Sequence, residues 1–198
     1  RDLGVPYTML SHGGRQACGL YPPSPEQGPT PYWSSYVNVT DVDATAERAV
    51  ALGATPVMPA MDVMGEGRMC VIQDPTGALV GLWQARAHPG AQIDNQVGAR
   101  SWSELLTRDT ARAAAFYGTL FGWTTRTSPE LMGGRYVLFE LEGKPVAGML
   151  QIQEDWGPMP PNWTVYFGVA DCDGALETAS QLGGSVLMGP MEIEKVGR

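Results

Sequence analysis

Polar and aromatic side chains alternate with apolar ones along three segments that read as β-strands, at residues 34–39, 102–107 and 164–169. Successive side chains of a strand point to opposite faces, so Glu104 shares a face with Trp102. Glu104 is the one acidic residue on the polar faces of these segments, and burial there would raise its pKa. Such a carboxyl group suits a general base or an anchor for a cationic ligand. The alternative is a structural ion pair with Arg68, Arg100 or Arg108.

The same alternation gathers hydroxyl, amide and aromatic groups on one face of the other segments. The opposite faces carry valine and phenylalanine, which we expect to pack on helices. The alternative roles are core packing for the tyrosines and the filling of a closed cavity for the tryptophans. The candidate ligand-binding residues on the polar face are Ser34, Tyr36, Asn38, Trp83, Trp102, Thr164 and Tyr166.

These segments recur because the chain contains a duplication. Residues 33–68 align without a gap with residues 163–198 at an offset of 130, and 13 of the 36 aligned pairs are identical. A repeat of this length indicates that a whole structural unit was copied. A weaker match, at an offset of 129, pairs Tyr7 with Tyr136 and Gly19 with Gly148.

Arg68 and Arg198 are equivalent positions of the repeat, and each follows a glycine. A guanidinium group kept in both copies can bind an anionic ligand through paired N–H groups. The alternative is an ion pair with a nearby acidic residue. We keep Arg68 as a further candidate ligand-binding residue.

Each repeat reads as a strand, a helix and an extended segment. The helices are expected to begin after Asp41 and Asp171, whose side chains can cap a helix, and to end near Leu52 and Leu182, before glycines. A further helix is predicted for residues 109–121. The remaining strands or extended segments are predicted at 56–61, 69–73, 79–83, 123–127, 135–141, 146–151 and 186–191, with a turn at 74–77.

We expect two domains, at residues 1–85 and 101–198. Residues 86–100 carry Pro and Gly without periodicity and are predicted to be the linker. When the two expected domains are aligned, the first lacks the strand, helix and strand that open the second. The second lacks the hairpin that closes the first. The expected parent protein is therefore longer, at about 240–260 residues, which is ordinary for two domains.

The composition excludes several classes of partner. A net charge of −8 argues against binding to nucleic acid, since no basic surface is available. No apolar run is long enough to span a bilayer, and a cytoplasmic protein is expected. The three cysteines lie far apart without metal-ligand spacing, which favours free thiols over disulfides.

Four motifs occur along the chain. They are Asp109-x7-Tyr117, Leu120-Phe121-Gly122-Trp123, Val-x-Asp-x-Asp in both repeats, and Gly67-Arg68-x5-Asp74-Pro75-x-Gly77. Together they resemble the vicinal oxygen chelate superfamily of glyoxalase I, bleomycin-resistance proteins and extradiol dioxygenases. The stretches 102–107 and 81–84 are more narrowly similar to two-domain glyoxalase-like proteins described as hydroxylases in antibiotic gene clusters or as an antigen. The resemblance implies an α+β fold, in which tandem βαβββ modules form two glyoxalase-like domains with cup-shaped mixed sheets.

Metal-dependent members of that superfamily hold their ion inside the cup, usually with His, Gln or Glu. The resemblance carries the ligand positions onto Trp102, Ser34, Thr164 and Gly81. None of these is a preferred ligand for Zn²⁺, Fe²⁺ or Mn²⁺. The two histidines of the chain fall in a turn and in the linker. We therefore expect no metal centre of the family type.

An aromatic cup with few polar groups suits a flat organic ligand. We expect a metal-independent protein that binds an aromatic or polyketide-like compound. Glu104 is the catalytic candidate for a tailoring hydroxylation or isomerisation, using the ligand's own reactivity or a flavin-like cofactor. The alternatives are sequestration of a toxic compound without chemistry, a metal-dependent glyoxalase or dioxygenase with ligands on missing strands, and a structural module with filled cups. A monomer is expected, because two tandem domains can replace a dimer.

Overall fold

The computed structural model describes residues 7–22, 31–194 and 196–198. Short 3₁₀ turns lie at Met132–Gly134 and Glu154–Trp156. Among the described residues, none of the helices reaches the length and apolarity that crossing a bilayer requires. The elements are β1 (Thr8–His12), β2 (Arg15–Leu20), β3 (Tyr36–Asn38), α1 (Val42–Ala51), β4 (Thr55–Val63), β5 (Gly67–Gln73), β6 (Leu79–Ala85), β7 (Arg100–Thr107), α2 (Thr110–Phe121), β8 (Thr124–Ser128), β9 (Tyr136–Leu141), β10 (Lys144–Gln151), β11 (Asn162–Phe167) and α3 (Cys172–Gln181).

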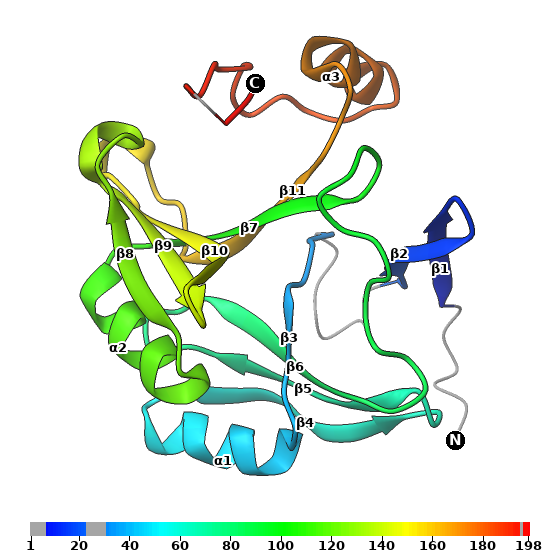
Figure 1. The fold of residues 1–198 in the computed structure, drawn as a ribbon, viewed down its shortest axis with the longest axis vertical. Helices are drawn as coiled ribbons and strands as arrows, with labels where there is room; N and C mark the ends of the chain where they lie inside the picture. The colour runs from blue at the N-terminus through cyan, green and yellow to red at the C-terminus, as the bar shows by residue number, and fades with distance from the viewer. Residues whose placement is uncertain (1–6, 23–30, 195) are drawn as a thin grey trace.

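The strands form two larger mixed sheets and a separate hairpin (Figure 1). One sheet has the order β11-β7-β10-β9-β8 and the other the order β3-β6-β5-β4, while β1 pairs only with β2. In each larger sheet the first strand of a βαβββ module runs parallel to the last, as β7 with β10 and β3 with β6. The expected α+β class with mixed sheets is confirmed.

One helix covers one face of each larger sheet (Figure 1). α1 packs on β4, β5 and β6, α2 packs on β8 and β10, and the two helices contact each other. The Arg48 side chain of α1 donates a hydrogen bond to the Leu120 carbonyl at the end of α2. A single core results, and it contains Val42 and Ile72 from the first predicted domain together with Leu105 from the second.

The expected helix caps are confirmed. The Asp41 carboxylate accepts a hydrogen bond from the Ala44 backbone N–H at 3.0 Å, and Asp171 accepts one from Gly174 at 3.1 Å. Asp109 serves α2 in the same way. Each cap satisfies a backbone donor that the first turn of a helix leaves without a partner.

The predicted turn at 74–77 joins β5 to β6 and reaches into the core. Gly77 adopts a φ of +105°, a backbone conformation that favours glycine. The Asp74 side chain is 3% exposed and accepts hydrogen bonds from Thr76 and from the Ala78 backbone N–H. Its other oxygen accepts one from the Tyr117 hydroxyl group of α2 at 2.7 Å, and Tyr117 accepts one from the Trp163 indole at 3.0 Å. This network connects the first repeat to α2 and β11.

The segment at 86–100 is more tightly held than a loose linker would be. Ile93 and Ala99 are buried. The Gln92 side chain accepts a hydrogen bond from the Gln16 backbone N–H at 2.9 Å, and the Gln92 backbone N–H donates one to the Gln16 carbonyl at 2.8 Å. These bonds connect the segment to β2.

Residues 186–191 form no strand, although the repeat predicts an extended segment equivalent to β4. β4 is held by pairing with β5, whereas the described residues provide no strand beside 186–191. The second copy also packs less: α3 has no buried residue, and Leu182 and Leu187 are 83% and 97% exposed. The duplication therefore does not give two equivalent sheets in the described part of the chain.

Replacing Tyr117 by Phe should destabilise the protein, because the buried Asp74 carboxylate loses a donor and the Trp163 indole loses an acceptor. Loss of a hydrogen bond to a charged group typically costs about 1.5–3 kcal/mol, which for a chain of this size is a fall in Tm on the order of 3–12 °C. Differential scanning calorimetry would measure the change. Tyr32→Phe, at an exposed position, is the control, and an equal Tm for the two variants would contradict the assigned role.

Candidate functional site

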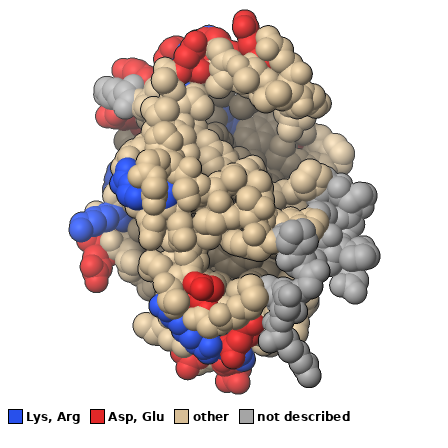
Figure 2. Space-filling model, turned by 90° about the vertical axis from the view of Figure 1, so that its right-hand side faces the viewer, with Lys and Arg blue, Asp and Glu red and all other residues tan. Residues whose placement is uncertain are grey.

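The free face of the five-stranded sheet gathers candidate residues from both predicted modules of the second domain. Across β10, β7 and β11, the register places Gly148 beside Glu104 and Glu104 beside Thr164. Tyr166 lies opposite Trp102. Directly paired residues of neighbouring strands share a face. The surface is hollowed below the C-terminal segment, which lies at the top of the molecule (Figure 2).

Glu104 is the buried acid at the centre of this face, with 7% of its surface exposed. One of its carboxylate oxygens accepts a hydrogen bond from the Tyr166 hydroxyl group at 3.1 Å. Burial raises the pKa of Glu104, and hydrogen bonds from Tyr136 and Tyr166 oppose that rise. The three arginines considered as ion-pair partners of Glu104 bond elsewhere: Arg68 to Asp43 and Asp62, Arg100 to Asp94, and Arg108 to backbone carbonyls.

A tryptophan extends this polar chain. The Trp102 indole donates a hydrogen bond to the Tyr136 hydroxyl oxygen at 2.8 Å, and Tyr136 bonds in turn to Glu104. Burial and the nearby Glu104 carboxyl raise the pKa of Tyr136 and of Tyr166, so both hydroxyl groups stay protonated and can donate. The result is a carboxyl group with two phenol donors between aromatic rings.

Gly148 makes room for this arrangement. A Cβ at this position would overlap the Tyr136 hydroxyl group and lie 2.8 Å from the Trp102 indole nitrogen. Gly19 stands in the same relation to Tyr7 in the first copy. Tyr136 is a site residue that strand alternation did not select. The signal that could have found it is the repeat itself, which pairs both the tyrosines and the glycines.

The candidates on the first sheet are arranged differently. The Tyr36 ring covers Gly81, where a Cβ would overlap it. The Trp83 indole donates a hydrogen bond to the His88 carbonyl at 3.0 Å, and the Asn38 amide donates one to Pro89 at 3.3 Å. Trp83 and Asn38 therefore bond to the segment at 86–100.

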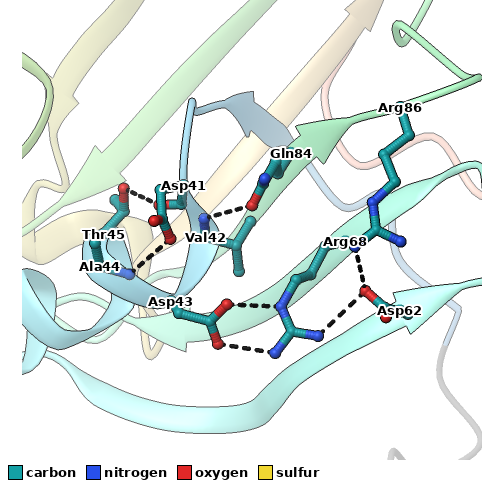
Figure 3. Close-up of polar contacts among 9 residues, drawn as sticks. All are labelled: Asp41, Val42, Asp43, Ala44, Thr45, Asp62, Arg68, Gln84 and Arg86. Atoms are coloured by element: carbon teal, nitrogen blue, oxygen red, sulfur yellow. Dashed lines mark hydrogen bonds and ion pairs between the residues drawn. The ribbon is translucent and has the colours of Figure 1, made fainter.

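Arg68 lies on the helix-covered face of its sheet, apart from Glu104. Its guanidinium group binds both oxygens of Asp43 at 2.7 and 2.8 Å, and Asp62 at 3.2 Å (Figure 3). Arg86 also binds Asp62. These hydrogen bonds hold the pKa of Asp43 and of Asp62 below the usual range. Arg198 binds Asp173 with the same two-bond geometry, so the duplication preserves an ion pair.

Ser34 and Thr164, equivalent positions of the repeat, line one groove of about 530 Å³ together with Gly81. The structure thus places the candidates in three locations. Trp102, Glu104, Thr164 and Tyr166 lie on the free face, Ser34 lines the groove that Thr164 also reaches, and Tyr36, Asn38 and Trp83 lie on the first sheet.

The residues at the positions that the family uses for a metal do not fit a divalent ion. Trp102 and Gly81 supply no ligand atom, and Ser34 and Thr164 supply neutral hydroxyl groups. No group of three His, Cys, Asp or Glu side chains comes together within the part of the chain that the structure describes. Glu104 is bonded to protonated tyrosines, which are weak ligands.

Comparisons with known proteins agree with this fold. The model of the "Glyoxalase/Bleomycin resistance protein/Dioxygenase superfamily" matches residues 2–82 and 99–195. "Putative glyoxylase CFP32" of Mycobacterium tuberculosis (strain CDC 1551 / Oshkosh) is 38% identical over 200 residues, which cover 98% of this chain and 75% of that protein. "Anthracycline biosynthesis protein DauV" of Streptomyces sp. (strain C5) is 33% identical over 174 residues, which cover 86% of this chain and 62% of that protein.

A search of solved structures also finds the 2,3-dioxygenase LapB from Pseudomonas sp. KL28. It has a TM-score of 0.48 and 15% identity, and the match covers 79% of this chain and 62% of LapB. The family match extends over both repeats, and the mycobacterial relative aligns over nearly the whole chain. The chain therefore belongs to the Glyoxalase/Bleomycin resistance protein/Dioxygenase superfamily.

Proposed function

We propose that this protein binds a flat aromatic compound of the polyketide kind, without a metal, on the free face of the five-stranded sheet. The observation that carries the proposal is the buried Glu104 carboxyl group, which two tyrosine hydroxyl groups bond between aromatic rings. Two relatives are named as anthracycline biosynthesis proteins, which supports this class of ligand. Anthracyclines are planar, fused-ring compounds that carry phenol and ketone groups.

The two kinds of group at the site serve different parts of such a ligand. Trp102, Tyr136 and Tyr166 offer ring faces and edges, and an aromatic pair contributes about 0.5–1.5 kcal/mol beyond its buried area. The Glu104 carboxyl oxygens accept a hydrogen bond from a ligand phenol. Tyr166 then turns its single hydroxyl hydrogen from Glu104 to a ligand ketone. The ligand is then recognised by its shape and by its oxygen pattern.

We assign Glu104 to proton transfer on this ligand. A raised pKa makes its carboxylate a stronger base than an exposed one. The proton moves from a ligand carbon next to a ketone to Glu104, the electron pair moves to the ketone oxygen, and a tyrosine hydroxyl group stabilises that oxygen. Return of the proton to another carbon completes an isomerisation. No oxidation occurs, so neither a metal nor a flavin-like cofactor is required.

We also propose that the protein is a cytoplasmic monomer, in which the two repeats take the place of the two subunits of a dimer.

The alternative to catalysis is sequestration, in which the compound is bound and left unchanged. The hydrogen bond from Tyr166 to Glu104 supports this alternative, because a carboxylate that accepts a hydrogen bond is a weaker base than a free one. Mass spectrometry of the ligand after incubation distinguishes isomerised product, or solvent deuterium incorporated next to the ketone, from unchanged compound.

Binding of 1,8-dihydroxyanthraquinone, a planar phenol and diketone, should quench tryptophan fluorescence in a saturable way. Glu104→Gln and Tyr166→Phe should each weaken binding about tenfold, which corresponds to about 1.4 kcal/mol, because each removes one polar partner of the ligand. Glu154→Gln changes an exposed acid and serves as the control. Equal affinity for Glu104→Gln and the unmodified protein would refute the proposed site.

The pH dependence of folding stability should reveal the protonation state of Glu104. Its pKa in the folded protein is above the value of 4.5 for an exposed carboxyl group, so the folded state keeps a proton that the unfolded chain releases. Folding stability due to Glu104 is therefore present at low pH and is lost as pH rises through the folded pKa. Glu104→Gln lacks this loss, so its Tm minus that of the unmodified protein should increase between pH 4 and pH 8. A difference that decreases over this range would contradict the raised pKa.

Metal analysis tests the absence of a cofactor ion. The purified full-length protein should contain far less than one Zn, Ni, Fe or Mn per chain by inductively coupled plasma mass spectrometry. Dialysis against EDTA should leave the affinity for 1,8-dihydroxyanthraquinone unchanged, since no preferred metal ligand lies at the family positions. A stoichiometric metal whose removal abolishes binding would favour the metal-dependent alternative.

A further inference from the structure

The hairpin of β1 and β2 presents an exposed apolar face at one side of the molecule (Figure 1). Among the described strands, β1 and β2 pair only with each other. Leu10 on β1 is 39% exposed, and Trp33, on the segment that leads to β3, is 44% exposed. Together with Cys18 of β2 they line a pocket of about 320 Å³. A two-stranded hairpin is at best marginally stable by itself in water, so an element that covers this face would stabilise it.

The second copy contains the same hairpin, but with its apolar face buried. β9 and β10 repeat β1 and β2 at the offset of 129. Leu10 pairs with Cys18 in the first hairpin. The residues at the same positions of the second hairpin, Phe139 and Ala147, also pair with each other. Phe139 is 0% exposed, so two hairpins of one register differ in what covers them.

A strand and a helix cover the hairpin of the second copy. β7 lies between β10 and β11, parallel to β10 and antiparallel to β11. On α2, the Tyr117 ring lies 5.6 Å from the ring of Phe139 and 5.5 Å from that of Trp163, measured between centroids. The Trp163 indole also donates its hydrogen bond to the Tyr117 hydroxyl oxygen. These contacts leave Trp163, the repeat partner of Trp33, only 7% exposed.

The first copy has open positions for both elements. β2 and β3 are the equivalents of β10 and β11, but no strand in the described part of the chain lies between them. Gln92 bonds only to the Gln16 end of β2. The Ser35 hydroxyl group, next to β3, is buried and bonds to none of the described residues, whereas Val165 at the same position of the second copy pairs with Ser103 of β7. The Trp33 indole N–H also bonds to none of the described residues.

We propose that this face is the docking site for a further strand and helix of the same polypeptide, built like β7 and α2. The strand pairs parallel to β2 and antiparallel to β3, as β7 does with β10 and β11. The helix fills the pocket with a tyrosine, whose hydroxyl oxygen accepts the free Trp33 indole N–H. Alignment of the two expected domains indicates only that the first lacks such elements, whereas the exposed face defines where they bind and which side chains they present.

The same polypeptide is the source because of the order of elements in the second copy. There the strand, the helix and the hairpin that they cover follow one another without interruption, from β7 through α2 to β10. A second copy of the chain or a separate protein would have to supply both elements without that continuity.

Cysteine labelling of the full-length protein tests this docking. Cys18 lines the exposed pocket, whereas Cys70 is 2% exposed in the core. A docked helix covers Cys18, so N-ethylmaleimide should modify Cys18 as slowly as Cys70 when the peptides are analysed by mass spectrometry. Modification of Cys18 at least about tenfold faster than that of Cys70 would overturn the proposal.

The Leu10→Lys variant tests the same face through stability. A lysine at this position places a charge against the docked helix, so the Tm of the full-length protein should fall by about 5 °C or more. Val50→Lys, at a similarly exposed position of α1, is the control and should change Tm by less than about 2 °C. An unchanged Tm for Leu10→Lys would contradict the docking. Labelling of the unmodified protein decides the question if Leu10→Lys fails to fold.

Size-exclusion chromatography distinguishes the sources of the covering elements. Slow labelling of Cys18 in a monomer supports a segment of the same polypeptide. Slow labelling that occurs only in a dimer and is lost on dilution would place these elements in a second copy and overturn the proposal. None of these measurements requires a ligand, so they are independent of the function proposed for Glu104.

Discussion

The Tyr117 hydroxyl group, bonded to both the Asp74 carboxylate and the Trp163 indole, is the contact on which the arrangement of the two repeats depends. A buried carboxylate is stable only when its oxygens are bonded, and Asp74 meets that condition through its own turn and through Tyr117. The rings of Phe121, Trp123, Phe139 and Trp163 surround Tyr117, with centroids 5.5–6.0 Å away. The network thereby holds β11, which carries Thr164 and Tyr166, against α2.

Features governed by neighbouring residues could be predicted from the sequence. The Asp41, Asp109 and Asp171 caps and the turn at 74–77 depend on bonds that span only a few positions. The shared face of Trp102 and Glu104 also follows from strand alternation alone. These rules hold because each bond joins groups only a few positions apart, so the nearby sequence decides whether it can form.

Features governed by distant contacts could not be predicted in this way. Tyr136 joins Glu104 only because β9 and β10 place it over Gly148. The Trp83 indole bonds to the segment at 86–100, whose path no local pattern reveals. The orientation of Arg68 could have been predicted from the sequence. Strand alternation puts Arg68 on the same face as Cys70 and Ile72, which pack against the helices. Its ion pair with Asp43 follows from that orientation.

The single core has a consequence for how this chain can be divided. The predicted boundary near residue 86 separates two copies in the sequence, but Val42, Ile72, Leu105 and Tyr117 lie in one hydrophobic cluster across it. Separating the copies there would expose apolar surface on both parts and leave the Asp74 carboxylate without its tyrosine. The two predicted domains therefore share one hydrophobic core. Cooperative unfolding should therefore include the first predicted domain together with β7 and α2, so a substitution in either part of this core also changes the stability of the other.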